Sequence, residues 1–153
     1  MTPVNTARVG YIDLSTKKVS TKEIPEDILR KYLGGRGLAA YLLYNHVGKG
    51  VDPFGPENAI IMSSGFLSGQ FTPAYGRFHV TGKSPDTGIY GDSNIGGSLG
   101  SELKYAGFQH LVITGKAEKP TYIYVHDGEI RLRDASNLWG LDTYQTQLRL
   151  WDE

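Results

Sequence analysis

The residues of this sequence that could do chemistry gather in a glycine-rich segment between residues 82 and 100. Six glycines fall in this stretch, and its second half, GDSNIGGSLG, runs directly into a helix predicted from Leu99 to Ala106. A helix N-terminus carries free N–H groups and the positive end of the helix dipole, and glycines let the backbone approach a bound group closely. The segment is therefore a candidate anion cradle. In the alternative interpretation, Ser93 or Asn94 only caps the helix and the glycines only permit tight turns.

Arg77 is a second candidate for anion binding. It begins a predicted strand in which Phe78 and Val80 alternate with polar residues, and it follows a loop rich in glycine. A guanidinium group there could hold a phosphate or carboxylate through two hydrogen bonds, although a solvated strand arginine is the simpler interpretation. The string from Gly76 to Ser84 imitates a phosphate-binding P-loop. However, five residues instead of four separate its glycines, and Pro85 opposes the helix that such a motif requires.

Other catalytic and metal-binding arrangements find little support. The chain has no cysteine, which excludes disulfides, thiolate nucleophiles, the usual structural zinc sites and cysteine-ligated iron–sulfur clusters within this chain. The four histidines have no i, i+4 pair and no acidic partner at metal-binding spacing, so no metal or acid–base role is expected of them: His46, His79, His110 and His126. No Ser–His–Asp triad or paired-carboxylate arrangement can be argued from the sequence.

Length and charge indicate one soluble domain. The chain has 153 residues, 39% of them hydrophobic, and its 16 lysines and arginines balance 16 aspartates and glutamates. A neutral charge disfavours general nucleic-acid binding. No stretch approaches the roughly 18 apolar residues of a membrane span, and residues 1–10 lack the apolar core of a secretory signal. We therefore expect a cytoplasmic protein without nucleic-acid or membrane partners.

The elements that must position these residues follow from hydrophobic periodicity and turn signals. Asp127-Gly128 between two β-prone runs is the strongest hairpin signal in the sequence. The final helix begins at an Asp142 cap and reaches the chain end, as if cut off. The sequence predicts strands over 8–14, 19–24, 59–63, 77–81, 110–114, 120–125 and 129–133, and helices over 26–33, 37–47, 99–106 and from 143 onward.

A weak internal echo suggests duplication. The strings LGGRGLAAYLLY (33–44) and IGGSLGSELKY (95–105) each have a glycine pair after one apolar residue, continue as a helix and precede a strand. Two copies are too few for a solenoid, so a duplicated unit is the better explanation. Because no regular βα alternation is present, we predict an α+β fold with two β-sheets, helices and a duplicated helix-plus-strands unit.

Seven collinear blocks make the sequence more specific. They are YLGGRGLA (32–39), DPFGPEN (52–58), GKSPDTG (82–88), DSNIGG (92–97), ELKYAG (102–107), GKAEKP (115–120) and DASNLWG (134–140). In this order, over nearly the whole chain, they resemble the N-terminal domain of the aldehyde ferredoxin oxidoreductases. The resemblance implies that residues 1–153 form a single such domain, truncated at its C-terminal end and lacking the later cluster-binding domains.

The resemblance implies a tungsten or molybdenum enzyme that oxidises aldehydes to carboxylic acids and passes electrons through a [4Fe–4S] cluster to ferredoxin. Two pterins, bridged by magnesium through their phosphates, hold the metal in this family. By position, Arg77 matches an arginine between pterin and cluster, Asn94 offers its backbone carbonyl to the magnesium, and Gly96 makes a backbone contact with the cofactor. Together with the flanking Ser93 and Gly97, these are the expected cofactor-binding residues.

The expected partners are the remaining domains of the same enzyme, ferredoxin, an aldehyde substrate and a second copy in a homodimer. The cluster belongs to the missing domains, so this chain alone is expected to be inactive. One departure from the family is the string GFLSG over 65–69, where members usually have GPLTG. The alternative is an autonomous module that binds phosphate or pterin, or acts as a scaffold, without chemistry.

Overall fold

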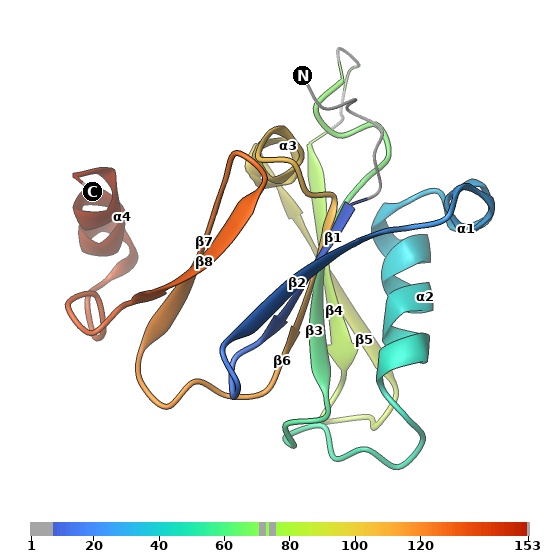
Figure 1. Ribbon diagram of the computed structural model, residues 1–153, viewed down its shortest axis with the longest axis horizontal. Coiled ribbons are helices and arrows are strands. Elements are labelled where there is room, and N and C mark those ends of the chain that lie inside the picture. Colours follow the sequence, from blue (N-terminus) through green and yellow to red (C-terminus); the bar gives the residue numbers. More distant parts are fainter. Residues whose placement is uncertain (1–7, 71–72, 74–75, 153) are drawn as a thin grey trace.

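The computed structural model describes residues 8–70, 73 and 76–152, and it has the predicted α+β architecture with two sheets (Figure 1). Six strands form one sheet in the order β2-β1-β6-β3-β4-β5, and β7 and β8 form a separate two-stranded ribbon. The strands are β1 (Arg8–Asp13), β2 (Lys18–Glu23), β3 (Ala59–Ser64), β4 (Arg77–Lys83), β5 (Tyr90–Gly96), β6 (His110–Thr114), β7 (Thr121–His126) and β8 (Glu129–Asp134). The helices are α1 (Glu26–Tyr32), α2 (Gly35–His46), α3 (Leu99–Tyr105) and α4 (Thr143–Trp151).

Most of the large sheet is antiparallel. The β1–β2 hairpin is confirmed, and β1 joins the sheet through a parallel pairing with β6 in which Val9 lies opposite His110. The centre of the sheet is the antiparallel pair β3–β6, followed by the antiparallel pairs β3–β4 and β4–β5. This arrangement leaves β5 as an edge strand.

Helix α2 covers one face of the sheet. Its buried side chains Leu38, Ala39, Leu42 and Leu43 recur at helical spacing and pack against buried strand residues: Val9, Ala59, Ile61 and Val112. We call this side of the sheet the α2 face. The helix begins at Gly35 rather than at the predicted Gly37, because α1 ends at Tyr32 and the chain turns through Leu33 and Gly34 at positive φ.

Helix α3 and the β7–β8 ribbon cover the opposite face, which we call the ribbon face (Figure 1). Its core consists of Ile12, Phe78, Leu103, Phe108 and Leu111, with four apolar ribbon residues packed against it: Ile123, Val125, Ile130 and Leu132. Both copies of the predicted duplicated unit are present, each as a helix that precedes a central strand: α2 before β3, and α3 before β6. The two helices lie on opposite faces.

The ribbon turns as predicted at Asp127 and Gly128, which both have positive φ, 46° and 80°. These values suit a two-residue hairpin turn whose twist matches the flanking strands. The C-terminal helix is also confirmed, as α4. Its predicted cap is confirmed too, because the Asp142 side chain accepts a hydrogen bond from the Gln145 N–H at 2.7 Å. In Figure 1, α4 lies beside the ribbon, away from the large sheet.

The predicted start of α3 at Leu99 is confirmed, but the expectation that the glycine-rich segment before it is a loop is wrong. Residues 90–96 form β5, which pairs with β4 along its whole length. Neither Ser93 nor Asn94 caps α3, whose N-cap is Ser98. The segment has few β-prone residues and several glycines, so its sequence does not predict a strand. Pairing with β4 decides its conformation instead, as long-range contacts often override local strand propensity.

Candidate functional site

The predicted site residues meet at one end of the β4–β5 pair. Arg77 lies opposite Gly96 in the strand register, and His79 lies opposite Asn94. Because side chains alternate between the faces of a strand, Arg77, Asn94 and Gly96 share the α2 face. The structure therefore brings three of the five predicted residues together. Ser93 points to the ribbon face, and Gly97 lies just beyond the end of β5.

The backbone at this end of β5 is bare and open. A Cβ atom built on Gly96 or Gly97 would meet no heavy atom of the described chain within 4 Å, and Gly97 has a φ of +110° that side-chain-bearing residues rarely adopt. Gly96 and Arg77 are both exposed. The described part of the chain thus leaves free space above bare backbone, next to an exposed guanidinium.

Further glycines crowd the same end of the sheet. A Cβ atom on Gly76 would lie 2.7 Å from the Gly97 carbonyl oxygen, so these two backbones touch. Gly35, at the start of α2, packs against Gly65, where a Cβ atom would come within 3.6 Å of the Gly65 Cα. Gly35 and Arg36, in the family block at 32–39, therefore lie near the same end of the sheet as the block at 92–97, although Arg36 and Asp92 are 56 positions apart in the chain.

A polar network that the sequence did not reveal lies directly below this end. His79, only 3% exposed, places its Nδ1 3.1 Å from the Asn94 Oδ1 and its Nε2 3.0 Å from the Tyr90 hydroxyl. Asp92 lies 3.7 Å from the same Nε2 and accepts a hydrogen bond from the Arg36 guanidinium at 2.6 Å. The predicted polar face of β4 was a signal for it, but only the pairing with β5 supplies the partners.

A second buried histidine continues this row across the sheet. His110 lies opposite Ser63 on β3, which itself lies opposite His79 on β4. The His110 Nδ1 is 2.8 Å from the Ser63 hydroxyl oxygen, while its Nε2 is buried without a hydrogen-bond partner among the described residues. Complete burial, helped by the positive charge of Lys104, lowers the pKa of His110 from 6.5 to about 3. The imidazole is therefore neutral at physiological pH.

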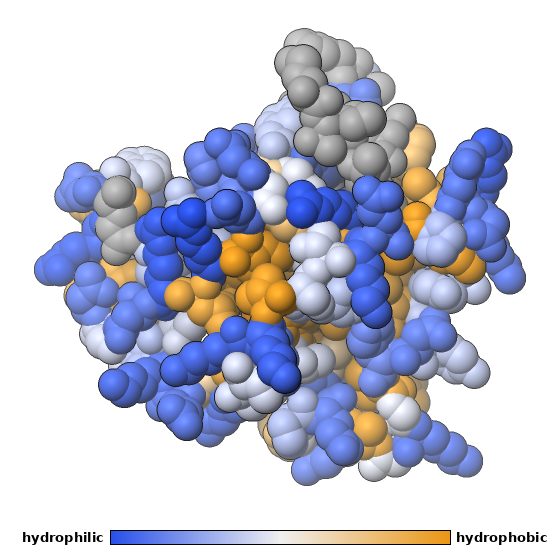
Figure 2. All heavy atoms as spheres, in the orientation of Figure 1, coloured by the Kyte–Doolittle hydropathy of each residue, from blue (hydrophilic) through white to orange (hydrophobic). Residues whose placement is uncertain are grey.

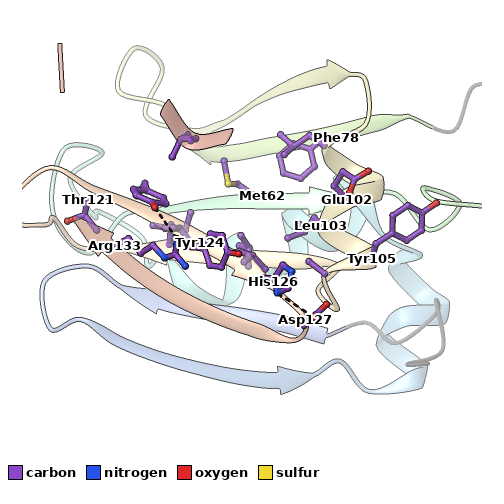
Figure 3. Close-up of a pocket in the computed structure, with 18 residues that line it drawn as sticks. Met62, Phe78, Glu102, Leu103, Tyr105, Thr121, Tyr124, His126, Asp127 and Arg133 are labelled. Carbon is purple, nitrogen blue, oxygen red and sulfur yellow. Dashed lines mark hydrogen bonds and ion pairs between the residues drawn. The ribbon is translucent and has the colours of Figure 1, made fainter. Parts of the chain in front are cut away.

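The ribbon face holds a separate apolar cavity of about 940 Å³ (Figure 3). Met62 and Phe78 of the large sheet face Tyr124 of the ribbon across it. Arg133 stacks over the Tyr124 ring, with its guanidinium carbon 3.7 Å from the ring centre. Figure 2 shows hydrophobic residues at the surface between the ribbon and the sheet. The large sheet separates this cavity from Arg77, Asn94 and Gly96.

Within residues 8–70, 73 and 76–152, no group of three or more His, Cys, Asp or Glu side chains could hold a metal ion. In the same residues, no helix is long and apolar enough to cross a membrane. A metal-bearing cofactor at the β4–β5 end would thus find no such cluster of side-chain ligands among these residues. Bare glycine backbone, backbone carbonyls and an exposed arginine suit a flat, phosphate-bearing group, and the open space at Gly96 and Gly97 fits its close approach.

Comparison of the whole fold shows the class of protein. The solved structure described as "Active site complex BamBC of Benzoyl Coenzyme A reductase in complex with 1,5 Dienoyl-CoA" matches with a TM-score of 0.93 and 32% sequence identity, over 97% of this chain and 23% of that one. The described architecture is thus that of a domain found within a much larger oxidoreductase subunit.

The family model "Aldehyde ferredoxin oxidoreductase, N-terminal domain" matches residues 9–153. The chain belongs to this family, which confirms the resemblance drawn from the seven sequence blocks. The "Tungsten-containing aldehyde ferredoxin oxidoreductase" of Pyrococcus furiosus is 44% identical over 97% of this chain and 25% of its own length. The protein of the same name from Thermococcus kodakarensis is 43% identical with the same coverage. The chain thus spans about a quarter of the length of these relatives.

Proposed function

We propose that this chain is the cofactor-supporting domain of a tungsten or molybdenum bis-pterin enzyme that oxidises aldehydes to carboxylic acids. The observation that carries the proposal is the convergence of Arg77, Asn94 and Gly96 at one exposed end of the α2 face, beside open space over bare backbone. The names of the two archaeal relatives, both 43% identical or more, support tungsten and an aldehyde substrate.

Each residue has a distinct proposed part in binding. The Arg77 guanidinium binds an anionic part of the cofactor through charge-assisted hydrogen bonds. The backbone of Gly96 and Gly97 lies against the cofactor, where any side chain would displace it. The backbone carbonyl of Asn94 would be a ligand of a magnesium ion that belongs to the cofactor, since oxygen donors are those that magnesium prefers. When bound, the cofactor supplies the redox chemistry of aldehyde oxidation.

Among the five predicted residues, Ser93 has the position that least supports a role in cofactor binding. Its side chain points to the ribbon face, away from Asn94 and Gly96, so any contact with the cofactor would use its backbone only. The structural position of Gly97 is better suited, because its positive φ and open surroundings keep that turn free of side chains.

The remaining activity is proposed to lie in other parts of the full-length enzyme. This chain has no cysteine, so the cysteine ligands of the proposed [4Fe–4S] cluster, which passes electrons to ferredoxin, would lie outside these 153 residues. The partners proposed for this domain are the remaining domains of the same enzyme and, in a homodimer, a second copy of the enzyme. We propose a cytoplasmic enzyme.

The test is cofactor retention in the full-length enzyme that carries this domain. Arg77→Ala removes a contact on the order of 1.5–3 kcal/mol, so it should lower tungsten and pterin per protomer about tenfold or more. Gly96→Val should do the same without unfolding the domain, because its Cβ would meet no heavy atom of the described residues within 4 Å and its φ is not strained. Tungsten by mass spectrometry and pterin fluorescence after release are the measurements, with circular dichroism as the check on folding.

Two matched controls lie at the other end of α2. Gly48→Val places the same side chain at a glycine with ordinary φ, where the new Cβ would meet, among the described residues, only Val51 at 3.8 Å. Lys49→Ala removes an exposed cation from the same loop. Both should retain full tungsten and pterin. If Arg77→Ala and Gly96→Val also retained them, the assignment of this end as the cofactor site would be wrong.

A separate experiment addresses the isolated chain. Purified without oxygen, residues 1–153 should contain no stoichiometric iron or sulfide and should oxidise no aldehyde, because every cysteine ligand for a cluster is missing. Stoichiometric iron and sulfide in this preparation would contradict the proposal that the cluster is bound outside these 153 residues.

A further inference from the structure

We propose that His79 is a positioning residue that holds the Asn94 segment of β5 in place for the cofactor. The inference rests on the proposed function, since it concerns the strand assigned above to cofactor binding. His79 itself is buried and does not reach the open end of the sheet. It acts through Asn94, whose side chain it contacts at 3.1 Å from the neighbouring strand.

The need for such a residue follows from the place of β5 in the fold. β5 is an edge strand, so the backbone ladder with β4 holds it from one side only. Glycines at 91, 96 and 97 have no side chains to pack, and most of the strand is exposed. A backbone carbonyl on such a strand can move unless side chains fix it. Three β5 side chains contact the body of the domain: Asn94 and Tyr90 contact His79, and Asp92 accepts a hydrogen bond from Arg36. Of these, Asn94 lies nearest to the open end at Gly96.

The chemistry of the contact fixes the role of each nitrogen. The Asn94 Oδ1 can only accept a hydrogen bond, so the His79 Nδ1 must donate. In the neutral ring, Nε2 then accepts, and the Tyr90 hydroxyl 3.0 Å away donates to it. The buried ring is thus held between two residues of β5, with Ser63 opposite it on β3. Outer residues that orient a metal ligand commonly change metal affinity 10- to 100-fold.

The two nitrogens of His79 can be separated by substitution. Asn carries its amide nitrogen two bonds from Cβ, like Nδ1, so His79→Asn keeps a donor for Asn94 and loses the contact with Tyr90. Gln carries its amide nitrogen three bonds from Cβ, like Nε2, so His79→Gln keeps a partner for Tyr90 and loses the contact with Asn94. Asn94→Leu removes the acceptor while leaving every backbone carbonyl in the chain.

The experiment measures magnesium and tungsten retained per protomer of the full-length enzyme after dialysis against increasing EDTA. His79→Gln and Asn94→Leu should release magnesium at about 10- to 100-fold lower EDTA than the unaltered enzyme, and the double variant should be no worse than either. His79→Asn should retain magnesium like the unaltered enzyme. His110→Asn is the matched control, since it alters a buried histidine of the same cross-strand row that contacts Ser63 instead of β5.

Each outcome has a defined meaning when Arg77→Ala and Gly96→Val are measured in parallel. If these two variants retain the metals, the proposed function itself fails. If they lose the metals while His79→Gln or Asn94→Leu retains them, the role of His79 is refuted and the cofactor site stands. Loss in His79→Asn equal to that in His79→Gln also refutes it, because the contact with Asn94 would then not be the cause. Melting temperatures identify a variant that fails to fold, and Asn94→Leu alone then decides.

Discussion

The buried His110 should make the stability of this domain depend on pH well above the range of its carboxylates. In the folded chain its pKa is about 3, against 6.5 as the ordinary value. In the protonated ring both nitrogens carry a proton, and the Nε2–H would then have no acceptor among the described residues, in a fully buried ring near Lys104. The folded state therefore stays unprotonated where the unfolded state takes up a proton.

The sign and the window follow from these two values. Above pH 6.5 both states are neutral and His110 has no effect on the free energy of unfolding. Below pH 6.5 the unfolded chain binds one more proton, so stability is lost as pH falls, at about 1.4 kcal/mol per pH unit, until the folded pKa near 3 is reached. Between pH 7 and pH 5 the loss is about 2 kcal/mol.

The assay is urea unfolding of the 153-residue chain at half-unit steps from pH 7 to pH 5, followed by far-ultraviolet circular dichroism. His110→Asn keeps a polar group near Ser63 but cannot titrate at this position, so the loss of stability assigned to His110 over this window should be absent, whatever the stability at pH 7. His126→Asn is the control, because that histidine is 64% exposed and its loss should leave the slope unchanged. The lowered pKa values of Asp13 and Asp134 act only below their ordinary value of 3.8.

An unchanged slope in His110→Asn would refute the reasoning. It would mean that the imidazole finds a proton acceptor or solvent in the folded state, contrary to its burial. A flat profile in the unaltered chain would refute it equally. If His126→Asn lost the slope, the pH dependence would come from His126, and its assignment to His110 would be wrong.

Three further predictions concern the framework. Leu42 is a residue of α2 whose side chain is 2% exposed in the core, so Leu42→Ala should lower the free energy of unfolding in urea by roughly 2–5 kcal/mol. Leu148 is 41% exposed, so Leu148→Ala should change this free energy little. Gly128→Ala should cost roughly 1–2 kcal/mol, measured the same way, because φ there is +80° and the new Cβ would lie 3.0 Å from the Arg8 guanidinium. Asp142→Ala should cost α4 about 1 kcal/mol and speed amide hydrogen exchange in that helix, since the bond to the Gln145 N–H is lost; unchanged exchange would show that the cap is not needed.

Local features of this protein could be predicted from the sequence because neighbouring residues determine them. The Asp127-Gly128 turn needs two positive φ angles, and Asp-Gly is one of the few residue pairs that adopt them readily. The Asp142 cap needs an oxygen three residues before an N–H. The run His110–Thr114 is apolar on both faces apart from its ends, as expected of a strand buried in the middle of a sheet.

The family resemblance was also within reach of the sequence, since seven blocks in order carry it, and with it came the expectation that Arg77, Asn94 and Gly96 share a site. The structure places these three residues at one end of the β4–β5 pair instead of in a loop before a helix. The string GDSNIGG has neither the alternation nor the β-branched residues of a strand, and it becomes β5 only because Arg77–Lys83 lies alongside it. Pairing between strands is a contact between distant residues, so no local pattern could distinguish this strand from a loop.

The four histidines show the same division most clearly. In the sequence they are alike, each a lone imidazole without a metal-binding neighbour. The tertiary structure leaves His126 exposed, ties His79 to Asn94 and Tyr90, and encloses His110 so fully that its pKa falls to about 3. The sequence by itself determined which residues could bind or titrate. Burial and cross-strand register decided which of them do, because the dielectric surroundings and hydrogen-bond partners of a side chain come from residues far away along the chain.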